Sequence, residues 1–255
     1  MSLVITPLMS FPMIEPGDDL SSEILSCLED NNLPLVENDI LVITQKVVSK
    51  AENRFVDLST ITPSEKAIKL GLQTEKDPRL VEVILRESNE VVRFRKGSLI
   101  VEHKLGFICA SAGIDHSNIS GGSKESNQSV LLLPVDPSAS AKKIRDAVFS
   151  KYGKNIGVLI IDSQGRAWRN GVVGMSIGLS GIPALIDERG WKDLYGSTLE
   201  ITIVGVVDEL AAAASLMMGQ ANEGTPVVHV RGFPYKLEEG NFNDLLRSKE
   251  TDLFR

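Results

Sequence analysis

The sequence contains few of the residues that usually mark a reactive or metal-binding centre. Only two cysteines, Cys27 and Cys109, occur among 255 residues, and no CxxC pair is present. This excludes a zinc ribbon and a dithiol redox site, and we expect both cysteines to be buried free thiols. The three histidines, His103, His116 and His229, are scattered, so an HExxH zinc hydrolase is excluded as well.

The common phosphate-binding fingerprints are also missing. The chain has neither GxxxxGK[ST] nor a GxGxxG that follows a strand, so any nucleotide site must be built differently. Basic charge is scarce, because 27 Lys and Arg stand against 34 Asp and Glu, a net charge of −7. Binding to nucleic acid requires a basic surface, and we therefore expect no nucleic-acid partner.

Long hydrophobic runs are absent. The longest uncharged run, residues 170–186, contains four glycines and Pro183, and it is too short to span a membrane. The first residues have no basic segment before Glu15 and Asp18, so we expect no signal peptide. These features predict a cytoplasmic protein with no membrane partner.

The composition is otherwise that of a folded domain. Hydrophobic residues make up 42% and charged residues 24% of the chain, which is ordinary for globular proteins and excludes disorder as the main state. A chain of this length buries roughly 70–75% of its unfolded surface. It corresponds to one or two domains.

Several helix starts can be read directly from the sequence. Capping residues followed by proline or by an apolar stripe predict four helices. Their starts are Thr62-Pro63-Ser64-Glu65 (a capping box), Asp77-Pro78, Asp136-Pro137 (a helix to about Ser150) and Gly17-Asp18-Asp19. A fifth helix is expected over Glu209–Met218, and because it is apolar nearly all round we expect it to be buried.

Apolar, β-branched runs predict the strands. These are Leu3–Thr6, Ile40–Thr44, Val91–Arg95, Ser98–Glu102, Gly157–Ile161, Glu200–Val207 and Val227–Arg231. Helices and strands alternate without a regular βαβ rhythm, which favours an α+β fold with a mixed sheet over a P-loop or Rossmann fold. We predict one unit over residues 1–255, with two α+β subdomains and a mobile polar loop near residues 119–129.

Two of the four polar segments that follow apolar runs suggest phosphate and metal binding. In the first, Lys46 and Lys50 come after the Ile40–Thr44 strand, and lysine is a compact cation suited to phosphate oxygens. The alternative interpretation is that the two lysines only mark a strand end that is exposed to solvent. In the second, Asp115 and Asn118 offer oxygen ligands for Mg²⁺ or Mn²⁺, or they form an Asx turn.

The other two segments suggest a metal pair and a further ligand contact. The Gly157–Ile161 strand would deliver Asp162 and Ser163 at its carboxyl end. Arg166 and Arg169 could clamp an anionic substrate, or pair with structural carboxylates. The last segment starts with Asp208, which we expect to cap the fifth helix. Its far end, with Gly219, Gln220, Asn222 and Glu223, could meet a nucleotide or a metal.

A series of ordered motifs makes the sequence recognisable. They are Phe11-Pro12-Met13-Ile14, Pro16-Gly17-Asp18-Asp19-Leu20, Gln45 to Glu52, Ala112-Gly113-Ile114-Asp115 with Ser117-Asn118, Leu133-Pro134 with Asp136-Pro137 and Ser140-Ala141, Asp162 to Arg166, Arg169 to Gly174, Asp193 to Gly196, Asp208 to Ala211, Met218-Gly219 and Arg231-Gly232. In these motifs the chain resembles the coenzyme F420-0:L-glutamate ligase family, the γ-glutamyl ligases of deazaflavin coenzyme synthesis. The resemblance covers residues from about 11 to 232.

The resemblance implies a GTP-dependent, GDP-forming amide ligase with a homodimeric α+β fold. It implies GTP, L-glutamate and coenzyme F420-0 as substrates and a divalent metal, Mn²⁺ or Mg²⁺, as cofactor, with K⁺ as a further candidate. Carried over by position, the expected nucleotide contacts are Phe11, Pro12, Met13, Ile14, Gln45, Lys46, Lys50, Asn118 and Gln220. The expected metal ligands are Asp115, Asp162, Ser163 and Gln220. We expect Asp115 and Asp162 to be catalytic, and we add Arg166 and Arg169 as anion-binding residues on our own interpretation.

Three positions depart from the family pattern. The family often has asparagine at position 111, glycine at 53 and threonine at 163, where this chain has Ser111, Asn53 and Ser163. Ser163 keeps the hydroxyl. The other two leave open a ligase that acts on a different small carboxylate. A non-catalytic nucleotide- or metal-binding relative is a further alternative, although the retained Asp115, Asp162 and Lys50 argue against it.

Overall fold

The computed structural model describes residues 2–117 and 128–254. Within these residues the largest sheet has five strands in the order β1-β12-β2-β8-β9. Their bounds are β1 Val4–Pro7, β2 Ile40–Thr44, β8 Gly157–Arg166, β9 Arg169–Ser180 and β12 Val227–Arg231. Strands β2 and β8 are parallel and the other neighbours are antiparallel. The prediction of an α+β fold with a mixed sheet is therefore confirmed.

The central strand β2 is buried on both faces. Ile40 and Val42 contribute to the core on one side, and Leu41 and Ile43 contribute to the core on the other. Burial on both faces explains why this strand is a continuous apolar run rather than an alternating one. It also makes the strand easy to recognise in the sequence.

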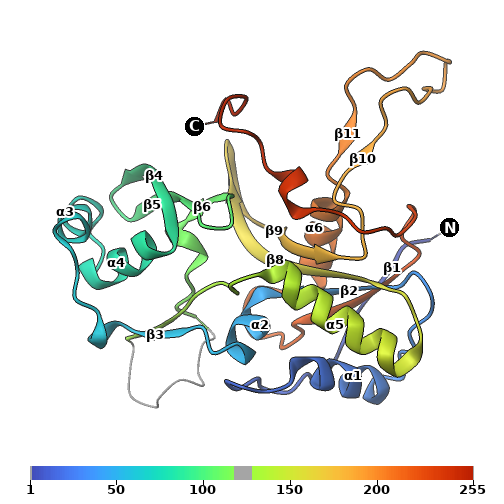
Figure 1. The fold of residues 1–255 in the computed structure, drawn as a ribbon, viewed down its shortest axis with the longest axis horizontal. Coiled ribbons are helices and arrows are strands. Elements are labelled where there is room, and N and C mark those ends of the chain that lie inside the picture. Colours follow the sequence, from blue (N-terminus) through green and yellow to red (C-terminus); the bar gives the residue numbers. More distant parts are fainter. Residues whose placement is uncertain (1, 118–127, 255) are drawn as a thin grey trace.

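Helices cover both faces of this sheet (Figure 1). Helices α1 (Leu20–Asp30) and α5 (Pro137–Tyr152) pack in one core, and α6 (Val206–Met218) packs in the other. Helix α2 (Gln45–Ala51) begins at the residue that follows β2. This immediate strand-to-helix junction places the Gln45 to Lys50 segment at the carboxyl end of the central strand.

A second group of elements has its own core (Figure 1). It consists of α3 (Glu65–Thr74), α4 (Pro78–Arg86) and a sheet of β4 (Ser88–Arg95), β5 (Ser98–His103) and β6 (Ile108–Ala110). Strands β3 (Phe55–Asp57) and β7 (Ser129–Leu131) pair with each other. The division into two subdomains stays a prediction, and residues 118–127, which hold most of the loop expected to be mobile, lie outside the described residues.

The remaining elements are short. Strands β10 (Ile186–Asp187) and β11 (Ile203–Val204) form the base of an arm, residues 186–204, that projects from the main body (Figure 1). Three 3₁₀ helices occur in the described residues, at Leu58–Thr60, Ser111–Gly113 and Phe242–Leu245. Across residues 2–117 and 128–254, no helix combines the length and the apolar character needed to cross a membrane.

Two of the expected helix caps, Asp77 and Asp136, are confirmed, and the one expected at Thr62 is wrong. Asp77 accepts from the Arg79 N–H and Asp136 accepts from the Ala139 N–H. In the expected capping box, Ser64 rather than Thr62 is the N-cap, and its hydroxyl accepts from an N–H within α3. Ser64 also donates its own N–H and O–H to Glu82 of α4, so this helix start is set by a tertiary contact.

Helix α6 differs from its prediction in three respects. It starts at Val206, so Asp208 lies inside the helix and is not its cap. The Asp208 carboxylate instead accepts from the Ser176 N–H of β9 at 2.9 Å, beside a β-bulge at Ile177. The helix is also not buried all round, because Leu216 is 82% exposed.

Two strand predictions need correction. Only Ile203–Val204 of the expected Glu200–Val207 strand is paired, because the following valines begin α6. The expected Gly157–Ile161 strand continues to Arg166 and turns into β9. Asp162 and Ser163 therefore lie within a hairpin strand, beyond the point where its parallel partner β2 ends, and not at a strand end.

Candidate active site

A cleft of about 510 Å³ lies where β2 gives way to α2. Its walls come from five separate parts of the chain: the segment before α1, the junction of β2 and α2, the segment after β6, the middle of β8, and the end of α6 with the loop that follows it. The residues that line it are Phe11, Pro12, Met13, Ile14, Thr44, Gln45, Lys46, Val47, Lys50, Asp115, Ser117, Ile161, Asp162, Ser163, Ser215 and the run from Met218 to Pro226.

Most residues predicted for the site meet in this cleft. It is lined by the Phe11–Ile14 segment, by Gln45, Lys46 and Lys50, and by Asp115, Asp162, Ser163 and Gln220. Asn118 lies outside the described residues. Arg166 and Arg169 do not line the cleft. They are opposite each other in the backbone register of β8 and β9, next to the turn that joins these strands. The prediction that the two arginines clamp a ligand is therefore wrong for this cleft.

Two carboxylates form the acidic part of the cleft. Asp115 is fixed by backbone hydrogen bonds in both directions with Leu131, and Asp162 comes from β8. Burial, reinforced by the negative charge of Asp115, raises the pKa of Asp162 to about 7. Burial also raises the pKa of Asp115, against the opposing effect of Lys46. Each carboxylate thus stands where negative charge is unfavourable without a cation.

Helix α2 supplies the groups that face Asp115. The Gln45 Nε2 donates to Asp115 Oδ2 at 2.6 Å, and the Lys46 Nζ lies 3.5 Å from Oδ1. Lys46 also donates to the Ser117 backbone carbonyl at 3.2 Å. Lys50 is only 5% exposed, and this burial lowers its pKa. Two cations therefore stand on one side of the acid pair.

The opposite wall depends on close packing between β9 and α6. Ser163 pairs across the hairpin with Gly174. A Cβ on Gly174 would lie 2.5 Å from the Ala211 carbonyl oxygen and 2.7 Å from Ser215 Cβ. The Ser215 hydroxyl instead accepts from the Gly174 N–H. This contact holds α6 against β9, so the loop that follows α6 and carries Gln220 is set beside Ser163.

Several lining residues were not predicted. Thr44, Ser215, Thr225 and Pro226 line the cleft, and no local pattern in the sequence marks them as functional. Ser215 could be found only through its contact with β9. Met218 was expected in the core, and it is 9% exposed while also lining the cleft.

The donor set fits a hard divalent cation. Asp115, Asp162, Ser163 and Gln220 offer two carboxylates, a hydroxyl and an amide oxygen, which suit Mg²⁺ or Mn²⁺. Within the described residues no group of three or more His, Cys, Asp and Glu is placed to hold a metal. The acid pair therefore needs neutral oxygens to complete a coordination shell.

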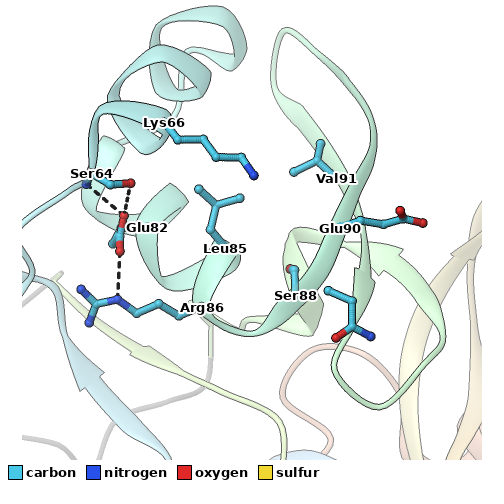
Figure 2. Close-up of a pocket in the computed structure, with 9 residues that line it drawn as sticks. Ser64, Lys66, Glu82, Leu85, Arg86, Ser88, Glu90 and Val91 are labelled. Atoms are coloured by element: carbon cyan, nitrogen blue, oxygen red, sulfur yellow. Dashed lines mark hydrogen bonds and ion pairs between the residues drawn. The ribbon is translucent and has the colours of Figure 1, made fainter.

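A second cavity, of about 230 Å³, lies between α3, α4 and β4 (Figure 2). Of its two acidic residues, Glu82 already accepts from Ser64 and from Arg86, and Glu90 accepts from Lys249. No residue predicted for the site lines this cavity. Its polar groups join the start of α3 to α4, which is a structural role.

Comparison with known proteins decides the family. A model of the F420-0:gamma-glutamyl ligase family matches residues 9–232. The chain belongs to this family. The expected family and the expectation of a ligase are thus confirmed.

Individual relatives match over nearly the whole chain. The coenzyme F420:L-glutamate ligase of Methanopyrus kandleri is 45% identical, over 100% of this chain and 98% of its own length. That of Methanothermobacter thermautotrophicus is 44% identical, over 96% and 95% respectively. The Archaeoglobus fulgidus ligase is 40% identical, over 100% and 97%. The matched family region includes every part of the chain that lines the cleft.

Proposed function

We propose that this chain joins L-glutamate to coenzyme F420-0 in a GTP-dependent reaction. The observation that carries the proposal is the cleft, where two lysines and an acid pair from separate segments meet in a chain of the F420-0:gamma-glutamyl ligase family. The relatives are named coenzyme F420:L-glutamate ligases. Lysines beside paired carboxylates suit a substrate that carries both phosphates and metal.

The chemistry requires activation, because a carboxylate does not condense with an amine unaided. The acceptor carboxylate attacks the γ-phosphorus of GTP, the bond to the β-phosphate oxygen breaks, and GDP leaves. The glutamate amine then attacks the acyl phosphate, an amine proton is released and inorganic phosphate leaves as the amide forms. Such phosphoryl transfer depends on positioning and on charge neutralisation.

The side chains of the cleft divide this work between them. Asp115, Asp162, Ser163 and Gln220 would hold Mn²⁺ or Mg²⁺, which offsets phosphate charge when bound. Lys46 and Lys50 would neutralise phosphate oxygens from the α2 side. The Phe11–Ile14 segment, where Phe11 is 9% and Ile14 2% exposed, would hold the nucleotide on a rigid wall. K⁺ is a further candidate cofactor, tested by replacing it with Na⁺.

The alternative of a different carboxylate acceptor was based on Ser111 and Asn53, and the backbone gives another reason for the residues at these two positions. Ser111 and Asn53 have φ values of 50° and 53°, in the left-handed region that favours glycine and asparagine. Neither residue lines the cleft. A backbone preference accounts for the residues that the family favours at these two positions, which supports coenzyme F420-0 as the acceptor.

We include a homodimer and a cytoplasmic location in the proposal. The arm exposes Leu194 at 99%, Tyr195 at 94% and Ile201 at 88%, and apolar groups gathered in this way are typical of an interface. Cys27 and Cys109 are both buried free thiols, as expected for a reducing compartment.

Mass spectrometry tests the reaction directly. Purified protein is incubated with GTP, Mn²⁺, L-glutamate and coenzyme F420-0, and the expected product is heavier by one or more glutamyl units. It should be absent without GTP, and GDP should accumulate only when glutamate is present. Binding of GTP without any mass shift would contradict the acceptor, and the absence of GTP binding would contradict the proposal as a whole.

A further inference from the structure

We propose that Ser49 is a positioning residue, whose hydroxyl holds the Gln45 amide in the orientation that donates to Asp115. The inference rests on the proposed function, since it takes Asp115 to be a ligand of a divalent cation. Ser49 touches no bound molecule in this scheme. It acts through Gln45.

The three side chains form a continuous chain of hydrogen bonds. The Ser49 Oγ donates to Gln45 Oε1 at 2.8 Å, and Gln45 Nε2 donates to Asp115 Oδ2 at 2.6 Å. Ser49 is 0% and Gln45 2% exposed, so water does not compete for these contacts. The two residues are four apart on α2 and therefore lie on one face of that helix.

The chemistry of an amide fixes the direction of this chain. An ionised carboxylate only accepts hydrogen bonds, so the Gln45 NH₂ group must face Asp115. The amide oxygen then points away from Asp115 into buried surroundings, where it needs a donor. Ser49 is that donor. Lys46 stands 3.5 Å from the other oxygen of Asp115, so both carboxylate oxygens are oriented from α2.

The Ser49 contact is not the usual one for a hydroxyl within a helix. Such hydroxyls commonly donate to the backbone carbonyl four residues earlier. Thr74 in α3 does so, donating to the Leu70 carbonyl at 2.7 Å. Ser49 donates instead to the side chain four residues earlier, which directs its hydroxyl toward the acid pair.

Removing the hydroxyl should weaken metal binding. We expect Ser49→Ala to raise the Kd for Mn²⁺, followed by the electron paramagnetic resonance signal of free Mn²⁺, by about 10-fold, as for other groups that orient metal ligands. Ser49→Thr keeps the donor and should restore affinity. The matched control is Ser21→Ala, since Ser21 is buried and its hydroxyl has no hydrogen-bond partner among the described residues.

A double-mutant cycle separates this role from general stability. Gln45→Met removes the amide, so Ser49→Ala should cause no further loss of Mn²⁺ affinity in that background. If Ser49→Ala causes the same loss of Mn²⁺ affinity in the unaltered protein and in Gln45→Met, the proposal is overturned. This comparison does not depend on whether Ser49→Thr folds. Unchanged Mn²⁺ affinity in Ser49→Ala would overturn it as well.

Asp115→Asn distinguishes failure of this inference from failure of the proposed function. If Asp115→Asn loses Mn²⁺ binding while Ser49→Ala does not, only the positioning role is wrong. If Asp115→Asn binds Mn²⁺ as tightly as the unaltered protein, the proposed metal site is wrong and the positioning role falls with it.

Discussion

Two single residues of the cleft, Asp115 and Asp162, stand where burial disfavours their charged form. Asp115 and Asp162 are carboxylates whose pKa values are raised by burial, and the charge of Asp115 raises the pKa of Asp162 further. A fold that only needed to be stable would place neutral groups here. The raised pKa values of this pair therefore support the cation site proposed above.

Asp115→Asn is expected to separate function from stability. Loss of the charge should reduce glutamate ligation by about 100- to 1,000-fold, the size of effect seen when a group that stabilises a transition state is removed. Because the negative charge is disfavoured by burial, the unfolding midpoint should stay the same or rise. Steady-state rates and thermal unfolding of the same preparation check this. Full activity in the variant would contradict the assignment of Asp115.

His103 makes a separate prediction about pH. Burial lowers its pKa to about 4, and its Nδ1 accepts from the Leu105 N–H. In the unfolded chain a histidine has a pKa of about 6.5. The unfolded state therefore binds more protons between these values, so the stability that His103 contributes is full above pH 6.5 and is lost as the pH falls toward 4.

The size of this effect is about 3 kcal/mol, from the difference between the two pKa values at 1.36 kcal/mol for each unit. Urea denaturation of the unaltered protein and of His103→Gln at pH 7.5 and pH 4.5 measures it. The unaltered protein should have a much higher free energy of unfolding than His103→Gln at pH 7.5, and this difference should shrink at pH 4.5. An advantage that is independent of pH would contradict a neutral buried His103.

At the scale of secondary-structure elements, the site depends on how closely α6 approaches β9. Two side chains of α6, Asp208 and Ser215, accept hydrogen bonds from backbone N–H groups of β9. The helix approaches so closely because Gly174 has no Cβ. These contacts define where α6 ends and therefore where Gln220 enters the cleft.

Gly174→Ala should push α6 away from β9. The new methyl group would meet the Ala211 carbonyl oxygen at 2.5 Å, and such overpacking costs about 1–3 kcal/mol. We expect a lower unfolding midpoint and a raised KM for GTP. Gly165→Ala is the matched control on β8, because nothing lies within 4 Å of its added Cβ. Equal behaviour of the two variants would mean that the helix contact does not shape the cleft.

At the scale of the whole molecule, contacts within one chain do not explain why the arm exposes so many apolar side chains. Residues 186–204 project from the body (Figure 1), and the arm exposes Trp191 at 52% and Leu194 at 99%. Its base is only the short pairing of β10 with β11. An apolar arm of this kind is stabilised when a second copy covers it.

Leu194→Glu combined with Ile201→Glu should therefore give a monomer. Both changes place charge on exposed positions, so they should leave the fold of one chain intact while making association unfavourable. Light scattering coupled to size-exclusion chromatography gives the mass in solution. Leu72→Glu is the control, since Leu72 is 76% exposed on α3, away from the arm. A dimer that survives both arm changes would contradict this role for the arm.

Local sequence signals determined several elements and most of the candidate site. Strands β2 and β12 have the predicted bounds, because β2 is an almost entirely apolar run and β12 is rich in β-branched valine. The Asp-Pro helix starts of α4 and α5 were also predictable, since capping is a contact between near neighbours. The candidate residues for nucleotide and metal were found as motifs, and all of those in the described residues line one cleft.

Other features were decided only by tertiary structure. Strand β9 contains Gly171, Gly174 and Gly178, which weakens a strand signal, and the reason for Gly174 and Gly178 is the close approach of α6 and of Pro137. The valines at positions 206 and 207 read as a strand but begin α6, because they pack in its core. The sequence itself thus determined which residues are candidates for binding and where buried strands run, since these depend on local chemistry. The role of Asp208, the tip position of Arg166 and Arg169, and the chain from Ser49 to Asp115 depend on contacts between distant segments, and only the folded chain brings those segments together.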